Sequence, residues 1–114
     1  MPLKYRNTPT HVDGQRFDSK GEARRYQDLR LLERAGQITA LRRQVSHRLE
    51  VNDVLIGFYR SDFEYVERGK HVVEDFKGVR TPEYRLKKAL MKACHGIDIF
   101  ETGSRRQPDA RAAA

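Results

Sequence analysis

The stretch VVEDFK, residues 72–77, decides how the rest of the chain is interpreted, because its valines and phenylalanine favour a β-strand. Side chains alternate between the two faces of a strand, so Asp75 and Lys77 share one face while Glu74 and Phe76 share the other. A register shifted by one residue would bring Glu74 to the first face instead. Of these two acids, only Asp75 is followed two residues later by a lysine, and this relation makes Asp75 and Lys77 the candidate catalytic pair.

A second carboxylate is predicted to lie beside this strand. Residues 54–66 are rich in Phe, Tyr, Ile and Val and predict a strand, and residues 67–70 predict a tight hairpin turn. Asp62 can therefore lie beside Asp75, where two carboxylates repel each other. A divalent cation, Mg²⁺ or Mn²⁺, removes that repulsion, and it can activate water to attack a phosphodiester. Lys77 would orient or deprotonate the water, or neutralise charge on the phosphorus.

The first helix is predicted over residues 20–35. Ser19 followed by Glu22 fits a capping box, and Gly36 is a favourable residue just past a helix end. One helix face carries apolar residues at helical spacing, although Arg25 falls among them. Glu22 lies on that face, so this helix can supply a third acid to the site.

A second helix is predicted from Thr81-Pro82, a capping hydroxyl followed by a proline at the first helical position, to Gly96. Helical spacing divides its residues between two sides. The side expected to be buried comprises Leu86, Ala89, Leu90 and Ala93. The side expected to face away comprises Tyr84, Lys87, Lys88 and Met91.

The remaining segments complete the order of elements. Asp13-Gly14 predicts a short hairpin within residues 4–17, residues 38–51 predict a strand that a turn joins to the next, and residues 97–100 predict a last short strand. Hairpin, helix, three strands, helix and strand indicate an α/β (α+β) fold, a mixed sheet flanked by helices. The predicted organisation is an N-terminal arm (1–17), a core (18–102) and a disordered tail (103–114).

The amino-acid composition limits which classes of binding partner are expected. The 114 residues include 23 Lys and Arg against 16 Asp and Glu, a net charge of +7 that favours nucleic acid as a partner. The single cysteine, Cys94, excludes a disulfide framework or a zinc ribbon, and the four histidines show no metal-binding spacing. No apolar run is long enough to cross a membrane and no secretion signal is evident, so we expect a cytoplasmic protein.

Asp62, followed thirteen positions later by Asp75-Phe76-Lys77, resembles the motif of the PD-(D/E)XK nuclease superfamily. The preceding helix with Glu22 and the following helix match the αβββαβ core of that superfamily. Ser61 stands where the superfamily motif has a proline, a residue that is often replaced there.

A narrower resemblance covers residues 4–101. The segments FDSKGEA, SDF and VEDFKG, together with Lys87-Lys88, resemble a small phage and prophage family of undefined function within the same superfamily. This resemblance points to a protein encoded by a phage or prophage and acting in the cytoplasm of a bacterial host.

The superfamily resemblance implies Mg²⁺-dependent hydrolysis of phosphodiester bonds in a restriction-endonuclease-like fold. It implies Asp62 and Asp75 as metal ligands and Lys77 as the catalytic lysine. It also implies Glu22 as an acid that completes the metal site, as in junction-resolving and transposon end-cleaving nucleases. DNA is favoured over RNA because the superfamily acts mostly on DNA.

Each of these residues also has a structural interpretation. Glu22 can serve as a helix cap, Asp62 as an exposed strand residue, and Asp75 and Lys77 as a simple salt bridge. Glu64, two residues beyond Asp62, is expected to be a solvated residue rather than a further ligand.

Polar and basic residues near the predicted site are candidates for contacts with DNA. The alternative is a solvated basic surface without a partner. The candidates are Arg42, Arg43, Gln44, Arg80, Tyr84, Lys87 and Lys88.

The resulting hypothesis is a metal-dependent DNA endonuclease. Because no recognition domain is appended, structure-selective cutting of branched DNA such as a Holliday junction is a natural role, by analogy with junction resolvases. A homodimer would bring two active sites to paired strands. A non-catalytic nucleic-acid-binding module and a nuclease subunit that needs a protein partner remain as alternatives.

Overall fold

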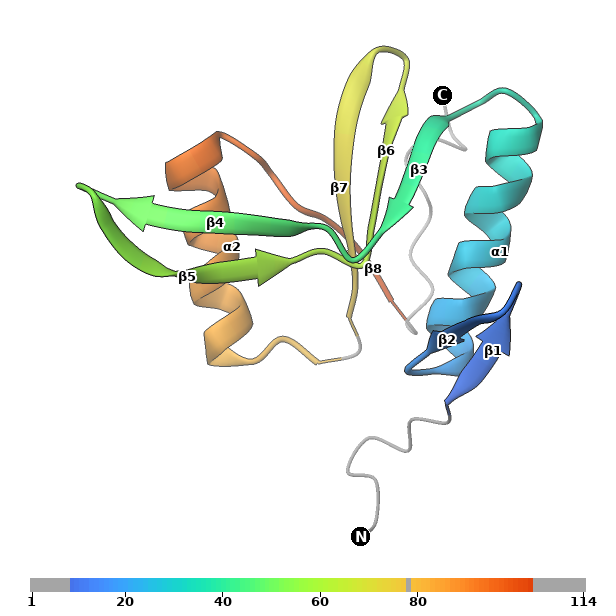
Figure 1. The fold of residues 1–114 in the computed structure, drawn as a ribbon, viewed down its shortest axis with the longest axis horizontal. Coiled ribbons are helices and arrows are strands. Elements are labelled where there is room, and N and C mark those ends of the chain that lie inside the picture. The colour runs from blue at the N-terminus through green and yellow to red at the C-terminus, as the bar shows by residue number, and fades with distance from the viewer. Residues whose placement is uncertain (1–8, 78, 104–114) are drawn as a thin grey trace, which may run out of the picture.

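The computed structural model describes residues 9–77 and 79–103, and it contains two helices and eight strands (Figure 1). Most of the predicted arm (residues 1–8) and the predicted tail after residue 103 lie outside the described residues. In chain order the elements are β1 (Thr10–Val12), β2 (Gln15–Phe17), α1 (Lys20–Arg34), β3 (Thr39–Arg43), β4 (Ser46–Val51), β5 (Val54–Arg60), β6 (Phe63–Glu67), β7 (Lys70–Phe76), α2 (Pro82–His95) and β8 (Phe100–Thr102).

The central sheet has the strand order β3-β6-β7-β8. Its pairs are antiparallel except β7 with β8, which run parallel because α2 crosses over between them. The sheet and its helices follow one another as α1, β3, β6, β7, α2 and β8, so the predicted mixed sheet flanked by helices is confirmed. Two hairpins, β1–β2 and β4–β5, are added to this core.

Local signals place the helix ends and turns where the sequence predicts them. The Ser19 hydroxyl accepts the Glu22 N–H at 3.1 Å, and the Thr81 hydroxyl accepts the Tyr84 N–H at 3.1 Å. Gly96 ends α2 in the left-handed conformation, with φ of 69°. The predicted N-terminal hairpin is confirmed as β1–β2.

Each face of the central sheet has its own hydrophobic core. α1 and the β1–β2 hairpin cover one face, while α2 and the β4–β5 hairpin cover the other (Figure 1). The first core contains Phe17, Ala23, Tyr26, Leu29, Ile38, Phe63 and Tyr65. The second contains Leu49, Tyr59, Val73, Tyr84, Met91 and Ile99.

The two long strands predicted over residues 38–51 and 54–66 are each broken. β3 and β6 belong to the central sheet, whereas β4 and β5 leave it as a separate hairpin. The breaks lie side by side, because the Gln44 N–H donates to the Asp62 carbonyl and the Ser61 N–H donates to the Val45 carbonyl. Gln44 has a φ of 51°, a left-handed conformation that ends β3 and turns the chain.

The predicted buried side of α2 is wrong except for Leu90, which is partly buried against the second core. Tyr84 and Met91 are buried, while Leu86 is 59% exposed. The Tyr84 and Met91 side is buried because it meets Val73 of the sheet and Leu49 and Tyr59 of the β4–β5 hairpin, a surface that exists only once the hairpin has folded over. The last strand also lies later than predicted, at Phe100–Thr102 rather than residues 97–100.

A buried ion pair joins α1 to the central sheet. Glu74 of β7 is fully buried, and Arg25 of α1 donates to its two carboxylate oxygens at 2.6 and 2.9 Å. The hydroxyls of Tyr65 and Thr102 also donate to Glu74, at 2.7 and 2.9 Å. Glu74 on β7 therefore bonds to α1, β6 and β8. Removing one partner from such a buried network destabilises the fold, because it leaves a buried polar group without its bond.

We expect Arg25→Met to lower the free energy of unfolding by about 3–5 kcal/mol, because it leaves the buried Glu74 charge uncompensated. Urea denaturation followed by circular dichroism measures this change. Arg16→Met is the matched control: it removes an exposed pair with Asp18 and should change stability by less than about 0.5 kcal/mol. Equal effects of the two substitutions would contradict the role assigned to Arg25.

Candidate functional site

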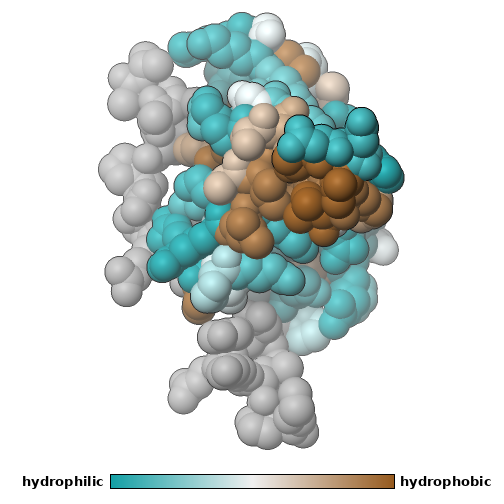
Figure 2. Space-filling view, turned by 90° about the vertical axis from the view of Figure 1, so that its left-hand side faces the viewer, coloured by the Kyte–Doolittle hydropathy of each residue, from teal (hydrophilic) through white to brown (hydrophobic). Residues whose placement is uncertain are grey.

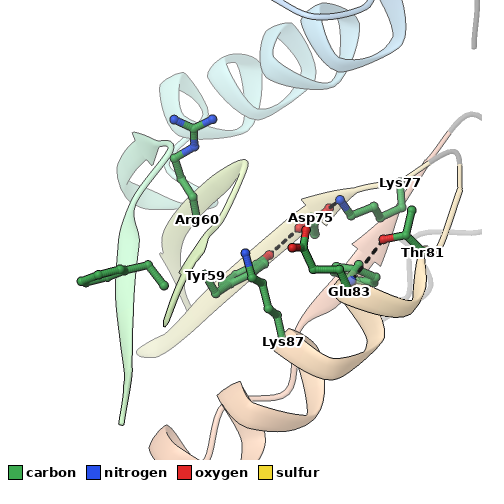
Figure 3. Close-up of a pocket in the computed structure, with 9 residues that line it drawn as sticks. Tyr59, Arg60, Asp75, Lys77, Thr81, Glu83 and Lys87 are labelled. Atoms are coloured by element: carbon green, nitrogen blue, oxygen red, sulfur yellow. Dashed lines mark hydrogen bonds and ion pairs between the residues drawn. The ribbon is translucent and has the colours of Figure 1, made fainter. Parts of the chain in front are cut away.

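Asp75 is buried on the side of the sheet that faces the β4–β5 hairpin and α2. Its side chain lies between two groups (Figure 3): the Tyr59 hydroxyl donates to Oδ2 at 2.5 Å, and Lys77 Nζ lies 3.3 Å from Oδ1. No described residue donates a hydrogen bond to Oδ1, so that buried oxygen has only the ion pair with Lys77. As predicted, Lys77, which directly follows β7, lies on the same side of the sheet as Asp75.

Asp62 is placed beside Asp75 by the break between β5 and β6. It lies in the two-residue link between those strands rather than on a strand, and its Oδ2 accepts the Phe76 N–H at 2.7 Å. Burial is the main cause that raises the pKa of Asp62 to about 8, and the charges of Asp75 and Glu22 add to it against the opposing effects of the Phe76 N–H and Lys77.

Glu22 approaches from the first turn of α1. Its backbone N–H, rather than its carboxylate, bonds to the capping Ser19, and the carboxylate lies 3.7 Å from Arg43. Burial raises the pKa of Glu22, and the charges of Asp18 and then Asp75 act in the same direction, while those of Arg43 and then Lys77 oppose it. The structure thus brings together all four residues that the sequence singled out, from α1, the β5–β6 link and β7.

A pocket of about 450 Å³ opens over Asp75 and Lys77 (Figure 3). Its walls come from β5, β7 and the start of α2, and its other lining residues are Phe58, Tyr59, Arg60, Thr81, Glu83, Tyr84 and Lys87. Lys77 Nζ lies 4.5 Å from the centre of the Tyr84 ring, a cation–π distance that holds the amino group over the pocket floor. The pocket therefore combines carboxylates, cations and aromatic rings.

Glu101, which the sequence analysis did not single out, holds three of the predicted DNA-contacting residues. Arg80, Tyr84 and Lys88 donate to its carboxylate at 2.8, 2.6 and 2.9 Å. Burial alone would raise the pKa of Glu101, but these bonds lower it to about 2. The parallel register of β8 pairs Glu101 with Asp75, a proximity hidden from the sequence analysis because it ended the last strand at residue 100.

The other predicted DNA-contacting residues lie in three places. Lys87 lines the pocket over Asp75, while Arg42 and Arg43 line a second pocket of about 400 Å³ beside α1. Arg43 donates to Gln15 Oε1 at 2.9 Å and lies 3.8 Å from the Phe17 ring centre, so it fastens the β1–β2 hairpin. Gln44 is exposed at the turn that ends β3.

The expectation of a solvated Glu64 is wrong, because this side chain is fully buried. Ser61 Oγ donates to Glu64 Oε2 at 2.8 Å, and His47 Nε2 bonds to the same oxygen. His71 Nε2 lies 2.7 Å from the other oxygen, Oε1. Arg42 lies 3.6 Å from Glu64. Two histidines from β4 and β7 thus enclose one carboxylate, a cluster that the scattered sequence positions did not reveal.

The negative charge of the carboxylates suits a hard divalent cation, but the carboxylates do not form a complete coordination shell. Among the described residues, no three His, Cys, Asp or Glu side chains converge closely enough to hold a metal ion as they stand. Mg²⁺ needs only one or two protein carboxylates, because water and phosphate oxygens complete its shell. Asp75 Oδ1, buried and without a hydrogen bond from the described residues, is the oxygen best suited to such an ion.

Comparison with known proteins identifies a family. The sequence profile of the family described as "Protein of unknown function (DUF1064)" matches residues 2–100, so the chain belongs to that family. No curated protein and no solved structure matches the chain. Within the described residues, no helix is long and apolar enough to cross a membrane.

The raised pKa of Asp62 predicts a characteristic dependence of stability on pH. Its pKa is about 8 in the folded chain against an ordinary value of 3.8, so the folded state holds the proton more tightly. Stability from this group is present below its ordinary pKa and is lost as pH rises towards 8. Without divalent cations, we expect Asp62→Asn to lessen this fall, because the amide carries no charge and can still accept the Phe76 N–H.

Thermal unfolding from about pH 5 to about pH 8 measures the effect. At the upper pH, Asp62→Asn should melt at least about 4 °C above the unaltered protein, the shift expected for ~1 kcal/mol in a domain of this size. Asp98→Asn, at an exposed carboxylate paired with Lys92, is the control and should not reproduce the gain. Identical pH profiles for Asp62→Asn and the unaltered protein would contradict the raised pKa of Asp62 in the folded chain.

Proposed function

We propose that this member of the DUF1064 family is a Mg²⁺-dependent endodeoxyribonuclease. One observation carries the proposal: Glu22, Asp62 and Asp75, from separate elements, gather beside Lys77 where a pocket opens over Asp75. Acids gathered in this way repel one another: the charges of Asp75 and Glu22 both raise the pKa of Asp62. A divalent cation would turn this repulsion into attraction.

In the proposed site, Asp75 and Asp62 hold the cation and Glu22 completes its surroundings, directly or through water. Bound there, Mg²⁺ would supply Lewis-acid activation of water and charge for the leaving oxygen. Tyr59 positions Asp75 by donating to Oδ2, which leaves Oδ1 turned towards Lys77. Lys77 orients the attacking water or neutralises charge on the phosphorus, because its amino group lies at the pocket floor.

The pocket walls support a nucleic acid as the substrate. Lys77 and Lys87 place cations at the opening, where they could contact phosphates. The net charge of +7 would attract a polyanion over the whole surface. Glu83 lies on the same wall and disfavours phosphate at that one point.

The arrangement of the chain also supports kinship with the PD-(D/E)XK superfamily, in which DNA is the usual substrate. The order α1, β3, β6, β7, α2, β8, with the β4–β5 hairpin between β3 and β6, resembles the αβββαβ order of that core, and Asp62, Asp75 and Lys77 resemble its motif. The proposal therefore extends to branched DNA such as a Holliday junction, and to recombination or repair in the cytoplasm of a bacterium that carries the phage or prophage.

Lys77→Ala should lower the rate of Mg²⁺-dependent DNA cleavage by about 10²–10⁴-fold, which is the usual contribution of a side chain that takes part in proton transfer in the transition state. Linear, single-stranded, flapped and four-way-junction DNA would be incubated with Mg²⁺ or Mn²⁺, and products separated by electrophoresis. Lys92→Ala is the matched control, since Lys92 is exposed and pairs only with Asp98 among the described residues. It should cut as the unaltered protein does.

The assay also distinguishes the alternatives. Cutting that survives EDTA, or that is equal in Lys77→Ala and Lys92→Ala, would contradict the proposed site. Binding of DNA without cleavage of any substrate would point to a binding module if metal binding is also absent. The same result with intact metal binding would point to a subunit that needs a partner.

A further inference from the structure

The β4–β5 hairpin carries an apolar surface that nothing in the described chain covers. Its members, named here the hairpin patch, are Val51 (38% exposed), Val54 (58%), Leu55 (46%), Ile56 (50%) and Phe58 (50%). The space-filling view of this side of the molecule shows an apolar surface surrounded by hydrophilic residues (Figure 2). A contiguous apolar patch of this kind, rimmed by polar groups, marks an interaction surface on a protein.

The strand itself indicates how a partner would engage the patch. Within the described residues β5 pairs only with β4, so its outer edge offers unpaired backbone N–H and C=O groups. Three consecutive residues of β5 are exposed, Val54, Leu55 and Ile56, and consecutive residues lie on alternate faces of a strand. A partner that packed on one face alone would therefore leave the other face uncovered. A second strand added to the edge would cover both.

The sequence of β5 is complementary to itself. In an antiparallel pair of two β5 strands centred on Ile56, Val54 faces Phe58 of the other copy and the two Ile56 side chains meet on the axis. The same register sets Arg60 opposite the Asn52-Asp53 turn of the other copy. Neither Asp53 nor Arg60 makes an ion pair within the described chain, so both charges are available across the junction.

We propose that two copies of this chain associate through antiparallel pairing of their β5 edges, forming a four-stranded β4-β5-β5-β4 sheet about a two-fold axis. Such an isologous contact uses the same patch on both copies. The hairpin patch supplies the apolar centre of this contact, and Arg60 with Asp53 supplies its polar rim.

The pairing has a consequence for the site, which rests on the proposed nuclease function. Phe58, Tyr59 and Arg60 form one wall of the pocket over Asp75, so the Asn52-Asp53 turn of the second copy lies at the edge of that pocket. The two pockets then lie on either side of one axis, an arrangement suited to cutting two strands of a branched DNA.

The test measures the oligomeric state of the full chain by sedimentation velocity without DNA or metal, so its outcome is independent of nuclease activity. The unaltered protein should sediment as a dimer. Ile56→Asp should weaken the dimer at least about 30-fold, as expected for a residue at the centre of an interface. Leu31→Asp is the matched control, because Leu31 is 60% exposed on α1, away from the hairpin, and should remain dimeric.

Disulfide trapping tests the register itself. Cys94 is the only cysteine, so Ile56→Cys in a Cys94→Ser background carries one thiol per chain. Because residues opposite each other on antiparallel strands have Cβ atoms close enough for a disulfide, mild oxidation should link this variant into a covalent dimer, and Leu31→Cys should not be linked. A monomeric unaltered protein, a dimer that survives Ile56→Asp, or equal cross-linking at both positions would overturn the proposal.

Discussion

Two neighbouring carboxylates on β7 point to opposite faces of the sheet, and the rest of the structure depends on how differently they are neutralised. Glu74 meets Arg25, Tyr65 and Thr102, so its charge is fully bonded and ties α1 to the sheet. Asp75 meets Tyr59 and Lys77 and keeps one buried oxygen without a hydrogen bond from the described residues. Strand alternation thus separates an acid that bonds the sheet to α1 from an acid that we propose binds a divalent cation.

The β4–β5 hairpin links the fold to the candidate site. By leaving the central sheet at Gln44 and returning at Ser61, the chain places Asp62 directly before β6, against the backbone of β7. The hairpin also brings Tyr59 to Asp75 and forms a wall of the pocket. A single insertion in the αβββαβ order therefore positions an acid, orients a second acid, and exposes the apolar edge proposed to join two copies.

The sequence predicted those features that local chemistry determines. Ser19, Thr81 and Gly96 fix the helix ends through caps, and the acid-x-lysine spacing fixes the shared face of Asp75 and Lys77. It did not predict the switch of sheets at Gln44, because a left-handed residue in the middle of a β-rich run has no local signal. That omission led to the wrong buried side of α2, since the surface that buries Tyr84 and Met91 is built by the hairpin.

The central claim, that the acids form a divalent-cation site, is tested most directly by calorimetric titration of Mn²⁺ into the protein without DNA. We predict saturable binding that weakens at least about tenfold in Asp75→Asn, a loss of ~1.4 kcal/mol. Because the raised pKa of Asp62 keeps a proton on the cluster, binding should also release protons, seen as a heat that varies with the buffer. Absence of saturable binding, or binding unchanged in Asp75→Asn, would contradict the account.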